Sequence, residues 1–187
     1  MSAFLSAAVG PTEAALLSVL AVACAVTDLW KGRIYNAITY PAIALGFVLA
    51  IVLHGMTGFW SALGGFAVGF FPAFLLFALG AMGGGDVKLL GAVGAIAGAV
   101  AATETLILAF VIGAFLALAK LAWHGQLFRT LGRTFRKLLG FVIPGLGRPV
   151  PEETPKRLEI KFGVAIALAT LATLYDLRSG ALTGLVM

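Results

Sequence analysis

The sequence predicts an all-α integral membrane protein of about six transmembrane helices. Hydrophobic residues make up 61% of the 187-residue chain, and its mean hydropathy of +1.06 exceeds what a soluble core of this size requires. Several apolar stretches reach the roughly 20 residues that a helix needs to cross a bilayer core about 30 Å thick. A membrane barrel would instead show short alternating segments, so helices are favoured.

The expected spans cover residues 13–30, 37–54, 58–82, 87–103, 105–122 and 161–177. The fourth is short and contains Gly91, Gly94 and Gly98, which suits close packing against other helices better than contact with lipid. Residues 1–12 of the chain carry no Lys or Arg, so the first span is expected to be retained rather than cleaved as a secretory signal. We expect 1–187 to form a single membrane-embedded domain.

The positive charges lie almost entirely on one side of this expected bundle. All but one of the thirteen Lys and Arg residues fall in or beside the loops 31–36, 83–88 and 123–160, and Arg178 is the exception. The positive-inside rule therefore makes these loops cytosolic and an even number of spans necessary. Membrane orientation also explains the net charge of +5, so nucleic acid is not an expected partner.

The polar segment 123–160 contains an amphipathic stretch that is expected to lie on the inner leaflet of the bilayer. Its apolar face comprises Phe128, Leu131, Phe135, Leu138 and Leu139, opposite Arg129, Arg133, Arg136 and Lys137. A linker rich in Pro and Gly follows within the same segment.

Two of the eight acidic residues fall at cytosolic ends of expected spans, namely Asp28 and Asp86. The others are assigned to helix starts, turns, the linker or the chain beyond the last span: Glu13, Glu104, Glu152, Glu153, Glu159 and Asp176. Carboxylates near hydrocarbon are costly and often functional. Two that share a site can hold one proton while the other activates water, as aspartic peptide hydrolysis requires. Alternatively, each caps a helix or pairs with Lys31 or Lys88 at the headgroups.

The residues around each aspartate narrow these alternatives. Gly83-Gly84-Gly85-Asp86 breaks a helix directly before the acid, and it matches the GxGD motif of membrane aspartic peptidases. The segment Asp28 to Asn36 resembles the first-aspartate segment of the prepilin peptidases, with Tyr35 at the family's proline position. Lys161-Phe162-Gly163 resembles the family's late Pro-aromatic-Gly segment, with Lys161 in place of proline.

The chain therefore resembles the prepilin peptidase family, or type IV leader peptidases, in the short form found with Flp-type (tight adherence) pili and without a methyltransferase segment. This implies a multi-pass aspartic endopeptidase of the bacterial inner membrane that serves pilus or secretion-system biogenesis. Its substrates would be pilin or pseudopilin precursors, whose short basic leaders it would remove at the cytosolic face.

The resemblance assigns catalysis to Asp28 and Asp86 with no cofactor. Gly83 and Gly85 are expected to shape the loop. Asn36 is a candidate for orienting a loop or the substrate backbone, with a turn-forming Asn as the alternative. Lys88 is a candidate for lowering the pKa of Asp86 or for meeting an acidic residue of the substrate, with a headgroup anchor as the alternative. A metal site is not expected, because Cys24 is the single cysteine and the two histidines fall on opposite sides of the membrane.

Two other classes of function remain open. In a small transporter or channel, Asp28 and Asp86 would bind a cation or relay protons, which predicts acids nearer the midplane and some repeat symmetry. A non-enzymatic assembly protein of a pilus or secretion machine would use the basic cytosolic segment for docking, which gives no reason for paired aspartates. The sequence leaves the oligomeric state open.

Overall fold

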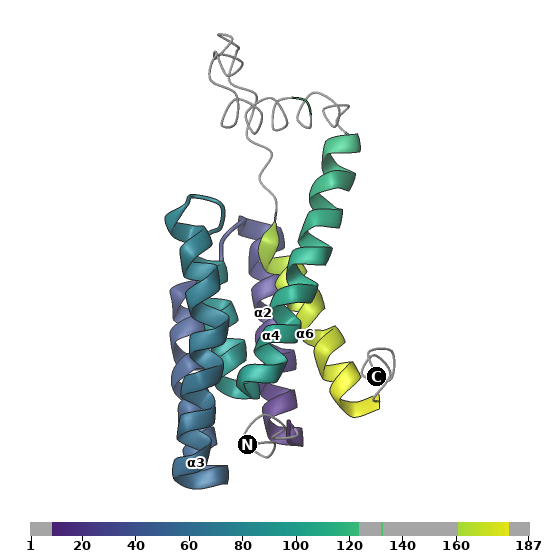
Figure 1. Cartoon of the computed structure of the whole chain (residues 1–187). Coiled ribbons are helices and arrows are strands. Elements are labelled where there is room, and N and C mark those ends of the chain that lie inside the picture. The colour runs from purple at the N-terminus through teal and green to yellow at the C-terminus, as the bar shows by residue number, and fades with distance from the viewer. Residues whose placement is uncertain (1–8, 124–131, 133–160, 180–187) are drawn as a thin grey trace. The chain divides into compact units, whose positions relative to one another are not determined.

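The computed structural model describes residues 9–123, 132 and 161–179. Within these ranges it contains four α-helices and no strand: α2 (Pro11–Lys31), α3 (Asn36–Ala78), α4 (Gly84–Trp123) and α6 (Phe162–Ser179) (Figure 1). The first three are long and apolar enough to cross a membrane, while the apolar part of α6, Phe162–Leu177, is shorter. The all-α membrane fold is therefore confirmed. The amphipathic stretch and linker expected within 123–160 lie outside the described residues, apart from Trp123 and Gly132.

Helices α3 and α4 are each interrupted by one glycine with non-helical backbone angles. Gly55 has a φ of 62° and divides α3 into 36–54 and 56–78, which fold back on each other as a hairpin (Figure 1). Gly98 has a φ of 82° and divides α4 into 84–97 and 99–123. Because positive φ is strained for residues with a Cβ, glycine permits both breaks. The described ranges thus hold six helical segments, although how many cross a membrane stays a prediction.

The position of the second break corrects the expected boundary between the fourth and fifth spans. The fourth segment ends at Gly98 rather than at 103, so Glu104 lies inside a helix and not in a turn. The reason is that Gly98 adopts the positive φ, while the alanines after it continue the helix. Asp176 was expected beyond the last span, yet it lies within α6 and is buried.

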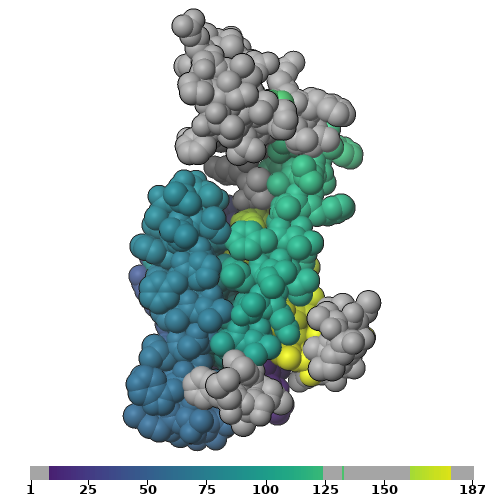
Figure 2. Space-filling model, in the orientation of Figure 1, coloured from purple at the N-terminus to yellow at the C-terminus, as the bar shows by residue number. Residues whose placement is uncertain are grey.

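Glycine brings α3 and α4 into close contact. A Cβ at Gly65 would overlap the carbonyl oxygen of Gly94, and one at Gly69 would overlap that of Leu90. In Figure 2 the surfaces of α3 and α4 adjoin each other. The expectation that the glycine-rich fourth span packs against helices is therefore confirmed.

The chain divides into two compact units. The first comprises 1–113 with 161–187, and the second comprises 114–160. The first unit contains α2, α3, all of α6 and α4 as far as Gly113. Its buried core includes Leu17, Leu89, Leu90 and Ile166. Both candidate aspartates belong to it. Of the second unit, the described residues are the end of α4 and Gly132.

We predict that Gly65→Ala lowers the melting temperature in detergent by roughly 3–10 °C, because the added methyl group would meet backbone that cannot rotate away. Gly64→Ala is the matched control, since nothing lies within 4 Å of a Cβ at that position. It should leave the melting temperature unchanged or slightly higher. Equal effects of the two substitutions would contradict the close contact of α3 with α4.

Candidate active site

The end of α2 and the starts of α3, α4 and α6 lie at the same end of the first unit (Figure 1). Helix α2 ends because Gly32 adopts a left-handed conformation with a φ of 62°, and its N–H donates to the carbonyl oxygen of Asp28 at 2.9 Å. Asp28 is thereby placed in the last turn of α2. Asp86 lies in the first turn of α4, which begins two residues earlier.

Asp28 is buried, with 6% of its surface exposed, and the start of α6 supplies its hydrogen-bond donors. The backbone N–H of Val164 donates to Oδ2 at 3.2 Å. The N–H of Gly163 also donates to this carboxylate. The first N–H groups of a helix have no partner within the helix and favour an anion. The position of Asp28 therefore depends on contact between α2 and α6.

Lys161 lies directly before α6 and contacts the same region. Its Nζ donates to the carbonyl oxygen of Leu29, the residue that follows Asp28. Its positive charge acts on the Asp28 carboxylate. The side chain of Lys161 thus ties the start of α6 to the last turn of α2.

Asp86 is partly buried and accepts a hydrogen bond from the backbone N–H of Gly83. It lies close enough to Asp28 for the two negative charges to interact, and both charges also act on the buried thiol of Cys24. The fold therefore brings the two predicted acids into one site from helices that are far apart in the sequence.

Ile34, in the loop between α2 and α3, packs against a glycine beside each acid. A Cβ at Gly85 would lie 2.9 Å from Cβ of Ile34, and a Cβ at Gly163 would lie 2.8 Å from its Cδ1. The same Cβ at Gly163 would also lie 2.9 Å from Oδ2 of Asp28. A side chain at Gly83 would meet Oδ2 of Asp86 at 2.9 Å. Glycine at these positions leaves room for the two carboxylates.

The other two predicted site residues, Asn36 and Lys88, contact each other. The Nζ of Lys88 donates to Oδ1 of Asn36 at 2.8 Å and lies 4.8 Å from the centre of the Tyr40 ring. These contacts hold the lysine against the first turns of α3.

Ile34 and Val164 lie in segments that resemble the family's, but the sequence assigned neither residue a role in this site. Val164 acts through its backbone, so its side chain gives no signal, although Gly163 beside it belongs to a segment that the sequence does single out. Ile34 looks like an ordinary hydrophobic loop residue. Only its contacts with Gly85 and Gly163 reveal that it belongs to the site.

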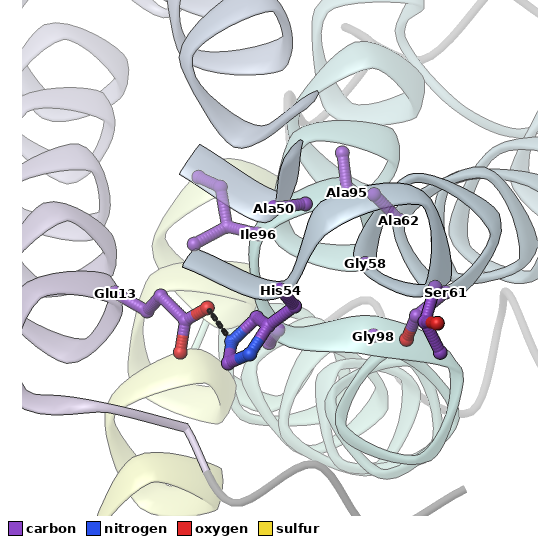
Figure 3. A pocket seen from close by; sticks show the side chains of 11 residues that line it. Glu13, Ala50, His54, Gly58, Ser61, Ala62, Ala95, Ile96 and Gly98 are labelled. Carbon is purple, nitrogen blue, oxygen red and sulfur yellow. Dashed lines mark ion pairs between the residues drawn. The ribbon is translucent and has the colours of Figure 1, made fainter. Parts of the chain in front are cut away.

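A separate cavity of about 150 Å³ lies beside the start of α2, the turn of α3 at Gly55 and the break of α4 at Gly98 (Figure 3). In it, Nε2 of His54 lies 3.5 Å from Oε1 of Glu13, and the N–H of Gly10 donates to Oε2 of Glu13 at 2.6 Å. The contact with His54 joins the start of α2 to the turn of α3, while the hydrogen bond from Gly10 caps α2 itself. Across the described ranges, no three His, Cys, Asp or Glu side chains are grouped as metal ligands would be.

Comparison with known proteins gives one match. A model of the type IV leader peptidase family matches residues 15–118. This range includes Asp28, Asp86 and the glycines at 83 to 85, but not the α6 segment that carries Gly163. No curated protein and no solved structure matches the chain.

We predict that Gly163→Ala lowers the melting temperature in detergent, because the methyl group would crowd both Ile34 and Asp28. Ile34→Val removes Cδ1 and should by itself cost about 0.5–1.5 kcal/mol. The loss in Ile34→Val/Gly163→Ala should be smaller than the sum of the two single losses, because the shortened side chain relieves one of the two clashes. Strictly additive losses would contradict the contact of Ile34 with Gly163.

Proposed function

The chain belongs to the type IV leader peptidase family, and on that premise we propose that it is an aspartic endopeptidase with Asp28 and Asp86 as its catalytic pair. The observation that supports this proposal is the meeting of the two carboxylates at one end of the helices. Their place in the last turn of α2 and the first turn of α4 also argues against a transporter, which would hold them nearer the midplane.

The reaction uses the two carboxyl groups in different protonation states. The ionised group takes a proton from water, whose oxygen attacks the scissile carbonyl carbon, while the protonated group gives its proton to the carbonyl oxygen. The C–N bond of the resulting diol then breaks. The nitrogen takes the proton from the first carboxyl, and a diol hydroxyl returns a proton to the second. Both groups finish as they began.

The proposed substrate is a pilin-like precursor of the Flp type, cut between its short basic leader and its apolar helix. Cleavage takes place at the cytosolic face of the bacterial inner membrane. Four of the described cations support this orientation, because Lys31, Arg33, Lys88 and Lys161 lie in or beside the loops that adjoin the acids.

We predict that Asp28→Asn and Asp86→Asn each reduce leader removal by about 10³-fold or more, because neither variant can divide one proton between two carboxylates. The double variant should be hardly worse than either single one, since the two groups act as a unit. The assay is the gel shift of a co-expressed Flp-type precursor, with membrane levels of each variant measured in parallel.

Asp176→Asn is the matched control, because Asp176 is also a buried helical aspartate but lies near the far end of α6. Its cleavage rate should stay close to that of the wild type. If either Asp28→Asn or Asp86→Asn retains substantial cleavage, the paired-aspartate assignment is wrong.

The orientation makes a separate prediction in a variant whose Cys24 is replaced by serine. A cysteine at the exposed residue Arg33 should react with an impermeant maleimide only from the cytosolic side. A cysteine at Met56, beside the α3 turn and 69% exposed, should react only from the outer side. Both positions avoid the neighbouring glycines with positive φ. Labelling of the Arg33 position from outside would place the acids on the wrong face for cytosolic cleavage.

A further inference from the structure

Deepening the proposed function, we infer that Lys161 is a positioning residue that, together with the amino end of α6, holds Asp28 as the anionic member of the catalytic pair. Asp28 is then the base that activates water, and the proton of the pair resides on Asp86. The assignment gives each aspartate its own role in the reaction, and it rests on the proposed function only for the catalytic consequence.

The contacts of Asp28 are those of a carboxylate that bears a charge. Two backbone N–H groups at the start of α6 donate to it, and both belong to the helix end that favours negative charge. The ammonium group of Lys161 adds a full positive charge nearby. The burial of Asp28 disfavours a charge, whereas these hydrogen bonds and the opposite charge of Lys161 favour the ionised form of the carboxyl and oppose the effect of burial.

The surroundings of Asp86 are less favourable to a second negative charge. It receives one backbone N–H, from Gly83, and it faces the charge of Asp28. The amino end of α4 does favour an anion, but among the described residues no lysine acts on Asp86 to offset the repulsion from Asp28. Lys88, two residues along α4, instead donates to Asn36 and lies over the ring of Tyr40. When one proton is shared between the two carboxyls, these contacts favour its residence on Asp86.

A hydrogen bond of Lys161 fixes the position of its positive charge. The hydrogen bond to the carbonyl oxygen of Leu29 holds the ammonium group beside the residue that follows Asp28. In the prepilin peptidases that the segment resembles, this position is proline, which carries no charge. The lysine of this chain therefore adds an electrostatic contribution that a proline could not make.

In the reaction, Asp28 takes the proton of the attacking water and Asp86 gives its proton to the carbonyl oxygen. When the C–N bond breaks, the proton on Asp28 passes to the departing nitrogen and a diol hydroxyl reprotonates Asp86. Lys161 touches no reacting atom. It acts through Asp28 by stabilising the charge that Asp28 carries at rest.

The first test compares the pH dependence of precursor cleavage by wild type, Lys161→Met and Lys161→Arg in detergent. Loss of the positive charge makes the anion less favourable, so the acid limb of the Lys161→Met profile should move to higher pH by about 0.5–1 unit. Lys161→Arg keeps the charge and should keep the limb near that of the wild type. A structural role alone would lower activity in Lys161→Met without moving the limb, and an unmoved limb would overturn the assignment.

The second test needs no catalysis, so it separates failure of this inference from failure of the proposed function. Melting temperatures at pH 7 are measured for wild type, Lys161→Met, Asp28→Asn and the double variant. The decrease caused by Lys161→Met should be larger in the wild type than in the Asp28→Asn background, where only the hydrogen bond to Leu29 remains to be lost. Equal decreases in both backgrounds would overturn the inference, whether or not the wild type cleaves a precursor.

Discussion

A carboxylate removed from water must find hydrogen-bond donors or an opposite charge, and the burial of Asp28 imposes this requirement on its neighbours. The start of α6 meets it with the N–H groups of Gly163 and Val164. The contact fixes where α6 begins relative to the last turn of α2, and it leaves no room for a side chain at Gly163. One hydrogen-bonded carboxylate thus joins two helices that are far apart in the sequence.

The second acid is positioned by packing more than by polar contacts. Helix α4 lies close to α3 because glycines at 65, 69 and 94 let backbone meet backbone. This contact sets the place of the first turn of α4, and therefore of Asp86. Ile34 fills the space between Gly85 and Gly163, so one apolar side chain packs against the neighbours of both acids. Loss of close packing far from the acids is consequently expected to change their separation.

The sequence predicted those features that depend on local composition. Hydropathy predicts the all-α membrane class, and the glycines of the fourth span predict its close packing. The GxGD pattern and the charge distribution single out Asp28 and Asp86 at the same end of the helices. The sequence placed the break in α4 after residue 103 rather than at Gly98. Gly91, Gly94 and Gly98 are the same residue type in similar apolar sequence, and only packing decides which of them adopts a positive φ. The bonds from Val164 to Asp28 and from Lys88 to Asn36 are tertiary, and no periodicity reveals them.

The central claim is that Asp28 and Asp86 share one site, and cross-linking tests it most directly. In a variant whose Cys24 is serine, cysteines replace both aspartates, and the protein is treated in the membrane with a short bifunctional thiol reagent. The account predicts rapid intramolecular cross-linking of this pair. Cysteines at 28 and 104 should remain separate, because Glu104 lies just after the break at Gly98, at the other end of the first half of α4 from Asp86. Failure of the 28–86 pair to cross-link, with both thiols shown to be reactive, would contradict the account.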